Sequence, residues 1–187
     1  MVGNPFVPAV YLSVVPPAWD ATQTMPENTT LTRTAGQDLV VERVFDAPRE
    51  LVWRAFTEPE RLAKWFGPKG WTLPVCNLDF RTGGVWHYMM QGPNGEESWG
   101  RAVYREIVEP ERIVYTDQFA DAAGNVNENM PSMLITMNFV DLGGSKTRLE
   151  SITHFGTEAE LQATLAMGVV QGLTETWDKL ADYLAAN

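Results

Sequence analysis

Six side chains in the middle of this sequence are of the types that perform acid–base chemistry. They are Asp79, His87, Tyr88, Arg101, Glu106 and His154. Such a group works as an acid or base when it sits in a water-poor cavity, where burial moves its pKa toward neutrality. The pattern favours structural roles instead, because polar residues on strands usually face solvent and a lone histidine is usually held by a neighbour. We therefore assign no catalytic residue.

The motifs typical of other chemistries are missing from the sequence. It contains no nucleophile motif, no glycine-rich phosphate loop and no metal-binding cluster. Two histidines and one cysteine are a poor set of metal ligands, and the histidines are not spaced as a helical pair. We expect no metal and no cofactor. The single cysteine, Cys76, excludes an intramolecular disulfide and suits a reducing cytoplasm, which is the expected location.

The chain is strongly acidic, and this restricts its partners. It has 14 Lys and Arg against 24 Asp and Glu, for a net charge of −10. Phosphate backbones and anionic lipids repel such a surface, which argues against nucleic-acid and membrane-surface binding. No segment approaches the ~20 apolar residues of a membrane span. The apolar stretch 6–19 lacks a preceding basic residue and is broken by prolines, so we do not interpret it as a secretory signal.

The hydrophobic pattern divides the 187 residues into an N-terminal extension, 1–37, and one domain, 38–187. The extension is rich in Pro, Thr and Asn, and we expect it to be partly disordered or packed on the domain surface. Its apolar side chains would need cover, which leaves self-association into a homodimer open. These side chains are Phe6, Tyr11, Leu12 and Trp19.

Alternating and β-branched residues predict seven strands joined by short turns. The strands are expected at 39–45, 71–80, 85–91, 98–108, 112–119, 132–141 and 147–155. Between the first two, helical spacing predicts two short helices, one after Pro48 and one from Glu60 to Phe66. Short turns between consecutive strands imply an antiparallel meander rather than parallel crossovers.

The last and longest element is a helix that begins at Thr157, with Glu160 at the capping-box position. Apolar residues then recur every three or four positions as far as Leu184. Gly168 and Gly172 lie in its central part, where glycine is about 1 kcal/mol less favourable than alanine. We expect both glycines to face inward, either for close packing or to leave room for a ligand.

A single helix leaves space against a strongly bent sheet unless large side chains fill it. Alternate residues of a strand share a face, and several such faces carry large side chains. One face has Trp86, Tyr88 and Met90, a second has Ile113, Tyr115 and Phe119, and a third has Met133, Ile135, Met137 and Phe139. These faces suit a solid core as well as a ligand pocket. The bend of the sheet is what favours a pocket.

Motifs in three parts of the chain resemble those of one known family. The first part comprises 41–48, 52–57 and 62–68, the second comprises 81–84 and 104–116, and the third is 168–180. Together they resemble the activator of heat-shock-protein-90 ATPase homologue-like family, of the START/Bet v 1-like (polyketide cyclase, SRPBCC) superfamily. The resemblance implies an α+β helix-grip fold, in which a curved antiparallel sheet, two short helices and one long C-terminal helix enclose a hydrophobic cavity.

A fold of this kind hosts different functions, so the function needs its own argument. We expect the domain to bind a hydrophobic or aromatic small molecule, because the motifs of catalysis are missing. The candidate cavity residues are Trp65, Phe66, Trp71, Trp86, Tyr88, Trp99, Tyr115, Phe119, Met133, Met137, Gly168 and Gly172.

Two alternatives stay open. The first is a polyketide cyclase or hydrolase-like enzyme that uses one of the acid–base side chains named above. The second is a co-chaperone-like stress protein. The family's namesake carries a separate chaperone-binding domain before this one, whereas residues 1–37 are too few for an independent domain. This argues against a chaperone partner.

Overall fold

The computed structural model describes residues 29–187, which form one sheet of eight strands and four helices. The strands are β1 (Leu31–Ala35), β2 (Asp38–Phe45), β3 (Thr72–Leu78), β4 (Val85–Gln91), β5 (Glu97–Val108), β6 (Arg112–Phe119), β7 (Ser132–Gly143) and β8 (Lys146–His154). The helices are α1 (Arg49–Thr57), α2 (Pro59–Trp65), α3 (Glu158–Ala166) and α4 (Val169–Ala185).

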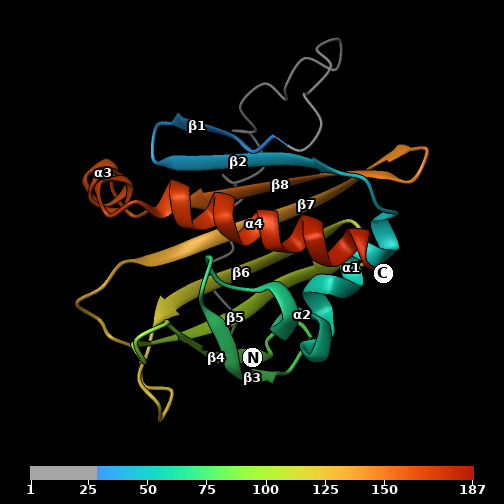
Figure 1. The fold of residues 1–187 in the computed structure, drawn as a ribbon. Helices are drawn as coiled ribbons and strands as arrows, with labels where there is room; N and C mark the ends of the chain where they lie inside the picture. Colours follow the sequence, from blue (N-terminus) through green and yellow to red (C-terminus); the bar gives the residue numbers. More distant parts are fainter. Residues whose placement is uncertain (1–28) are drawn as a thin grey trace, which may run out of the picture.

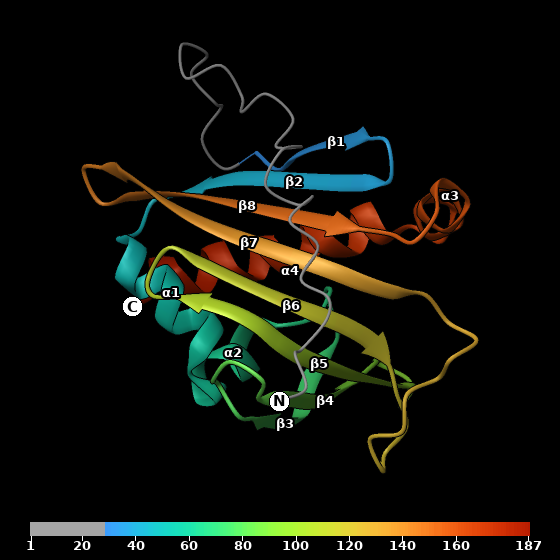
Figure 2. The same cartoon turned by 180° about the vertical axis from the view of Figure 1, so that it is seen from behind.

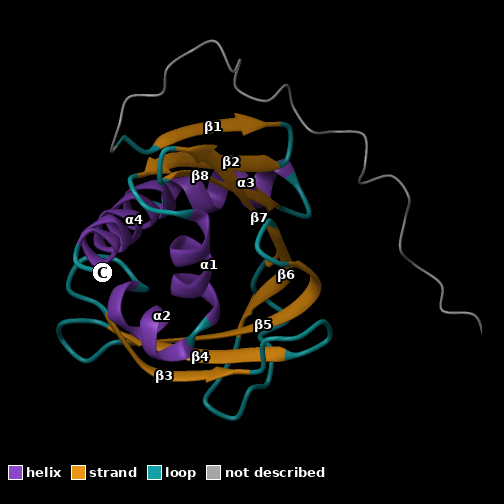
Figure 3. Ribbon diagram, turned by 90° about the vertical axis from the view of Figure 1, so that its right-hand side faces the viewer, coloured by secondary structure: helices purple, strands orange, loops and turns teal. Residues whose placement is uncertain are grey.

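The sheet is an antiparallel meander that bends around the helices. Its strand order is β1-β2-β8-β7-β6-β5-β4-β3. The described part of the chain therefore starts at one edge, crosses to the other through α1 and α2, and returns by hairpins (Figures 1 and 2). Viewed from the side, the sheet curls around α1, α2 and α4, with α4 against its concave side (Figure 3). A bulge in β5 between Tyr104 and Glu106 contributes to the bend. The α+β helix-grip fold is confirmed.

All seven predicted strands are present, but the sheet has one strand more. This is β1, which pairs with β2 across the turn at Gly36 and lies inside the segment assigned to the N-terminal extension. Its residues alternate only between half-buried and exposed, as suits an edge strand, and so its hydrophobic signal is weak. The rest of that extension, residues 1–28, lies outside the described residues.

The predicted C-terminal helix is in two parts. The capping box of Thr157 and Glu160 is present at the start of α3. The helix then ends at Gly168, whose φ of +83° is left-handed and cannot continue an α-helix. The long helix α4 starts afresh at Val169. No helix within residues 29–187 has the length and apolar character needed to cross a membrane.

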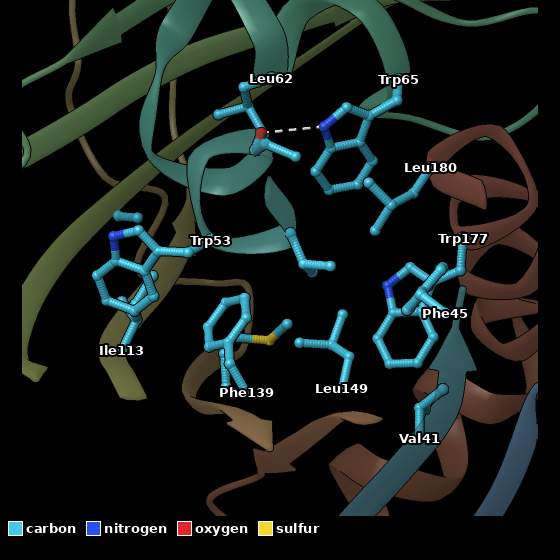
Figure 4. Packing of buried hydrophobic residues seen from close by; sticks show 14 of the residues in the cluster. Val41, Phe45, Trp53, Leu62, Trp65, Ile113, Phe139, Leu149, Trp177 and Leu180 are labelled. Carbon is cyan, nitrogen blue, oxygen red and sulfur yellow. Dashed lines mark hydrogen bonds between the residues drawn. The ribbon is translucent and has the colours of Figure 1, made fainter. Parts of the chain in front are cut away.

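One half of the space under α4 is a solid core. Aromatic rings from α1, α2, β2 and β7 meet Trp177, Leu180 and Leu184 of α4 there (Figure 4). The ring centroids of Trp53 and Phe139 are 5.2 Å apart. Trp65 lies between the helices and donates its indole N–H to the carbonyl of Ala55 at 3.0 Å, which satisfies its one buried donor (Figure 4).

Polar side chains fix α4 from both sides of this core. On the β2 side, Arg43 reaches Asp178 at 2.5 Å. On the α2 side, Arg61 donates to the hydroxyl of Tyr183 at 2.8 Å. Lys179 donates to the carbonyl oxygens of Gly67 and Trp71, both at 2.9 Å, and so ties α4 to the loop that follows α2. The position of α4 relative to the sheet is therefore set by directional contacts as well as by packing.

Replacing Lys179 with methionine tests this tie. The variant keeps the apolar stem but leaves two carbonyl groups without their donor, so we expect the free energy of unfolding to fall by about 1–3 kcal/mol. Urea unfolding measures the change. Lys64→Met is the matched control, since Lys64 is an exposed residue of α2. Equal stability of the two variants would show that Lys179 does not hold the loop.

Candidate functional site

The other half of the space under α4 is a cavity of about 320 Å³. Its walls are the concave faces of β4 to β8, and its cover is the first half of α4 together with the end of α2. The three strand faces that the sequence singles out all contribute, through Tyr88, Tyr115 and Met133 among others. The bend of the sheet thus leaves a space that the large side chains reduce but do not fill.

Nine of the twelve candidate residues border this cavity. They are Trp65, Phe66, Tyr88, Trp99, Tyr115, Phe119, Met133, Met137 and Gly172. Trp99 is on the face of β5 opposite that of Gly100, and its indole stacks on His87 at 5.1 Å between ring centroids. Gly172 faces open space, since a Cβ built on it would meet no atom within 4 Å.

The other three candidates lie elsewhere. Trp86 is in the core, 5% exposed, where its ring stacks under that of Tyr88 at 4.3 Å between centroids. Trp71 lies in the loop after α2, with its ring close to the Gly92 turn. Gly168 forms the break between α3 and α4 and borders a second, smaller cavity. Strand alternation and helical spacing do not distinguish a residue that lines a cavity from one in the layer beside it.

The second cavity, of about 270 Å³, lies where α3 meets α4. It shares four bordering residues with the first cavity, so the two lie side by side at this end of the sheet. The shared residues are Phe119, Met133, Thr164 and Val169. Met167, the residue that follows α3, is 69% exposed and also borders the second cavity.

One of the cavity residues outside the candidate set carries a charge, and this residue is Asp117. Among the described residues that line the cavity, Asp117 is the only one with a side chain that is ionised near neutral pH. It lies on β6 between Tyr115 and Phe119, so alternation alone places it on their face. Its neighbours across the sheet, Ala102 on β5 and Met133 on β7, offer no hydrogen bond from their side chains.

A tyrosine two strands away supplies the hydrogen bond. The hydroxyl of Tyr88 on β4 donates to the two carboxylate oxygens of Asp117, at 3.2 and 3.1 Å. The ring crosses β5 at Gly100, its register partner, where a Cβ would overlap the ring. The backbone N–H of Gln118 donates to the same carboxylate at 3.1 Å. Gly100 is therefore needed so that Tyr88 can reach Asp117.

The apolar surroundings shift the protonation of both groups. Burial raises the pKa of Asp117 to about 6, although the bonds from Tyr88 and Gln118 oppose the shift. Burial, and then the nearby charge of Asp117, raise the pKa values of Tyr88 and Tyr115 well above the usual range. Both phenols therefore stay protonated, while the carboxyl titrates close to physiological pH.

The other acid–base side chains lie away from the cavity. His87 contacts the carbonyl of Asp121 at 3.0 Å, and His154 contacts Asp38 at 2.6 Å. Glu106 accepts from Arg112 and Asp79 accepts from Arg81 on the exposed surface. Arg101 pairs with His87 in register and shares its face of the sheet, opposite that of Tyr88. Within residues 29–187, no three His, Cys, Asp or Glu side chains gather closely enough to hold a metal ion.

Comparison with known proteins gives both a family and close structural neighbours. The family described as "Activator of Hsp90 ATPase homolog 1-like protein" matches residues 46–185. A crystal structure from Mycobacterium smegmatis is 28% identical with a TM-score of 0.76, and the match covers 87% of this chain and 99% of that one. A solution structure from Staphylococcus epidermidis is 32% identical with a TM-score of 0.74, and covers 83% and 93% of the two chains. A crystal structure from Nitrosomonas europaea is 28% identical with a TM-score of 0.71, and covers 82% and 97%. No curated protein matches the chain.

Adding one methyl group at Gly100 tests the path of Tyr88. We expect Gly100→Ala to lower the free energy of unfolding by about 1–3 kcal/mol, because the ring must leave its position over β5. Gly172→Ala is the control, since its Cβ meets no neighbour and alanine is up to about 1 kcal/mol better in a helix. Chemical denaturation compares the two. A Gly100→Ala protein as stable as wild type would contradict the geometry.

The charge of Asp117 should make the protein less stable above its pKa. The pKa of the carboxyl is about 6 in the folded protein and 3.8 when the group is exposed. The folded state therefore binds its proton more tightly, and this contribution to the free energy of unfolding is fully present below pH 3.8 and is lost as the pH rises through 6. We expect Asp117→Asn to raise the free energy of unfolding by on the order of 2 kcal/mol at about pH 8, and to have no effect at about pH 3.5.

Thermal or urea unfolding across this pH range makes the measurement. Asp182→Asn removes an exposed charge from α4 and controls for net charge. A stabilisation by Asp117→Asn that is the same at both pH values would contradict the assigned pKa.

Proposed function

The chain belongs to the family of activator of Hsp90 ATPase homolog 1-like proteins, and on that premise we propose that it binds an apolar or aromatic small molecule in the main cavity. The observation that carries this proposal is the cavity itself. Its volume of about 320 Å³ lies within the range of small-molecule sites, ~300–1,000 Å³. An apolar space of that size holds a molecule of one to three rings.

The composition of the walls supports this proposal. Aromatic and methionine side chains form most of the surface, and a few hydroxyl groups, such as those of Ser151 and Thr153 on β8, interrupt it. Flat rings give large contact areas, and methionine adapts to irregular shapes. Such walls bind by shape and by burial of apolar surface, with few polar groups to fix the orientation of the ligand.

Binding without chemistry fits the polar groups better than a cyclase or hydrolase does. Acyl transfer or cyclisation needs a nucleophile or a second acid beside a general base. Beside Asp117, the hydroxyl groups of Tyr88 and Tyr115 are the nearest titratable groups of the cavity wall, and burial raises the pKa of both. The hydroxyl of Tyr88 already donates a hydrogen bond to Asp117. The arrangement holds a carboxylate in place rather than preparing a nucleophile.

A bulky residue that points into the cavity should block binding. We expect Gly172→Phe to weaken the affinity for N-phenyl-1-naphthylamine, a neutral fluorescent probe, by at least about tenfold. The reason is that Gly172 faces the open space of the cavity. Fluorescence titration measures the dissociation constant, and far-ultraviolet circular dichroism checks the fold.

The control carries the same ring on the outside of α4. Gln171→Phe changes the neighbouring, exposed residue and should leave the affinity within about twofold of wild type. Absence of probe binding to the wild-type protein, or equal binding by both variants, would contradict the proposed site.

A further inference from the structure

We propose that the ligand of this cavity carries a protonated amine, and that the carboxylate of Asp117 is the group that pairs with it. This inference rests on the proposed function and adds the chemical class of the ligand. The charges at the site are what favour a cationic ligand over a neutral one.

The carboxylate has no cation of its own in the part of the chain that the structure describes. The hydrogen bonds it accepts come from two neutral donors, the Tyr88 hydroxyl and the Gln118 N–H. None of the described residues that line the cavity is a Lys, Arg or His. Lys179 is the one basic residue of α4, and it donates to backbone carbonyls of the loop after α2. A buried charge without a counter-ion is unfavourable, and a ligand cation would supply the missing partner.

The walls around Asp117 suit an organic cation. The ring of Tyr88 is fixed from two sides, stacked on Trp86 and in edge contact with Phe66 at 5.7 Å between centroids. Tyr115 precedes Asp117 on the same face, with its ring 6.0 Å from that of Tyr104. Aromatic faces attract ammonium groups, most strongly where water is excluded. The same rings would exclude an anion, which the carboxylate also repels.

The hydrogen bond from Tyr88 does not use all the acceptor positions of the Asp117 carboxylate. Because the hydroxyl donates to Asp117 with its single proton, it leaves other lone pairs of this cavity-lining carboxylate without a donor. An ammonium group brings up to three donors to that position. Gly100 makes the arrangement possible by letting the ring of Tyr88 cross β5. Gly100 and Tyr88 are therefore positioning residues, and Asp117 is the binding residue.

The pH dependence of binding follows from the groups that face Asp117. Those that titrate are Tyr88 on β4, Tyr104 on β5 and Tyr115 on β6, and all three have pKa values raised above 10. The faces of β7, β8, α3 and α4 that line the cavity contribute only neutral side chains. Below about pH 10, the carboxyl of Asp117 is therefore the group that changes charge, with a pKa of about 6 in the free protein. Affinity for a cation should fall as the pH drops below that value, and affinity for a neutral molecule should not.

A series of three ligands with one ring system tests the inference on the full-length protein. They are 2-naphthylmethylamine, which is a cation near neutral pH, 2-naphthalenemethanol, which is neutral, and 2-naphthoate, which is an anion. Isothermal titration calorimetry at about pH 8 should give a dissociation constant for the amine that is ten- to a hundred-fold lower than for the alcohol, with the anion weakest. The advantage of the amine should shrink as the pH is lowered through about 6.

Two variants connect the effect to the named residues. Asp117→Asn should bring the ratio of amine to alcohol affinity close to one, whereas Asp182→Asn, on the exposed face of α4, should keep the wild-type ratio. Tyr88→Phe removes a bond that lowers the pKa of Asp117, so the pH at which amine affinity is half lost should move upward. Tyr88→Phe thus tests the inference even when Asp117→Asn fails to fold.

The outcomes separate this inference from the proposed function. Equal affinity of wild type for amine and alcohol, or an amine preference that Asp117→Asn retains, overturns the inference and leaves the cavity as a neutral ligand site. Failure of all three ligands and of the neutral fluorescent probe to bind overturns the proposed function as well.

Discussion

A single helix, α4, has to cover the concave side of an eight-stranded sheet, and the rest of the molecule follows from how it does so. Directional contacts by Arg43, Arg61 and Lys179 hold the helix at a fixed position against β2 and α2. Under its second half, Trp177, Leu180 and the rings of α1 and α2 fill the space. Under its first half, no helix stands between α4 and the sheet, and the cavity remains (Figure 1). The close-packed core under the second half of α4 stabilises the domain, and the cavity under the first half stays open for a ligand.

The hollow half contains an arrangement that stability alone does not explain. Asp117 places a carboxyl among rings and methyl groups, where burial raises its pKa to about 6. A protein selected only for stability would replace it, because an apolar or amide side chain of similar size avoids the loss of hydration. Its position beside a tyrosine fixed by two neighbouring rings and by Gly100 is typical of a site that is organised in advance for a ligand.

Most of the fold, and much of the cavity wall, could be predicted from sequence, for physical reasons that also explain the errors. Strand alternation identified the faces of Tyr88, Tyr115 and Met133, because period-two patterns specify which side of a sheet is buried. Asp117 lies in the same alternation and was passed over, since a polar residue in a strand is usually assigned to the solvent side. The break at Gly168 depends on a left-handed φ that the spacing of apolar residues does not reveal. Whether Trp86 lines the cavity or lies behind Tyr88 is decided by the packing of the two rings, which no local pattern specifies.

A crystal structure of the protein with 2-naphthylmethylamine tests the central claim most directly. The account predicts the naphthyl ring in the space bordered by Tyr115, Met137 and Gly172, with the amine nitrogen about 3 Å from the carboxylate of Asp117. A cavity closed by its own side chains, or a ligand bound there with its nitrogen turned away from Asp117, would contradict it.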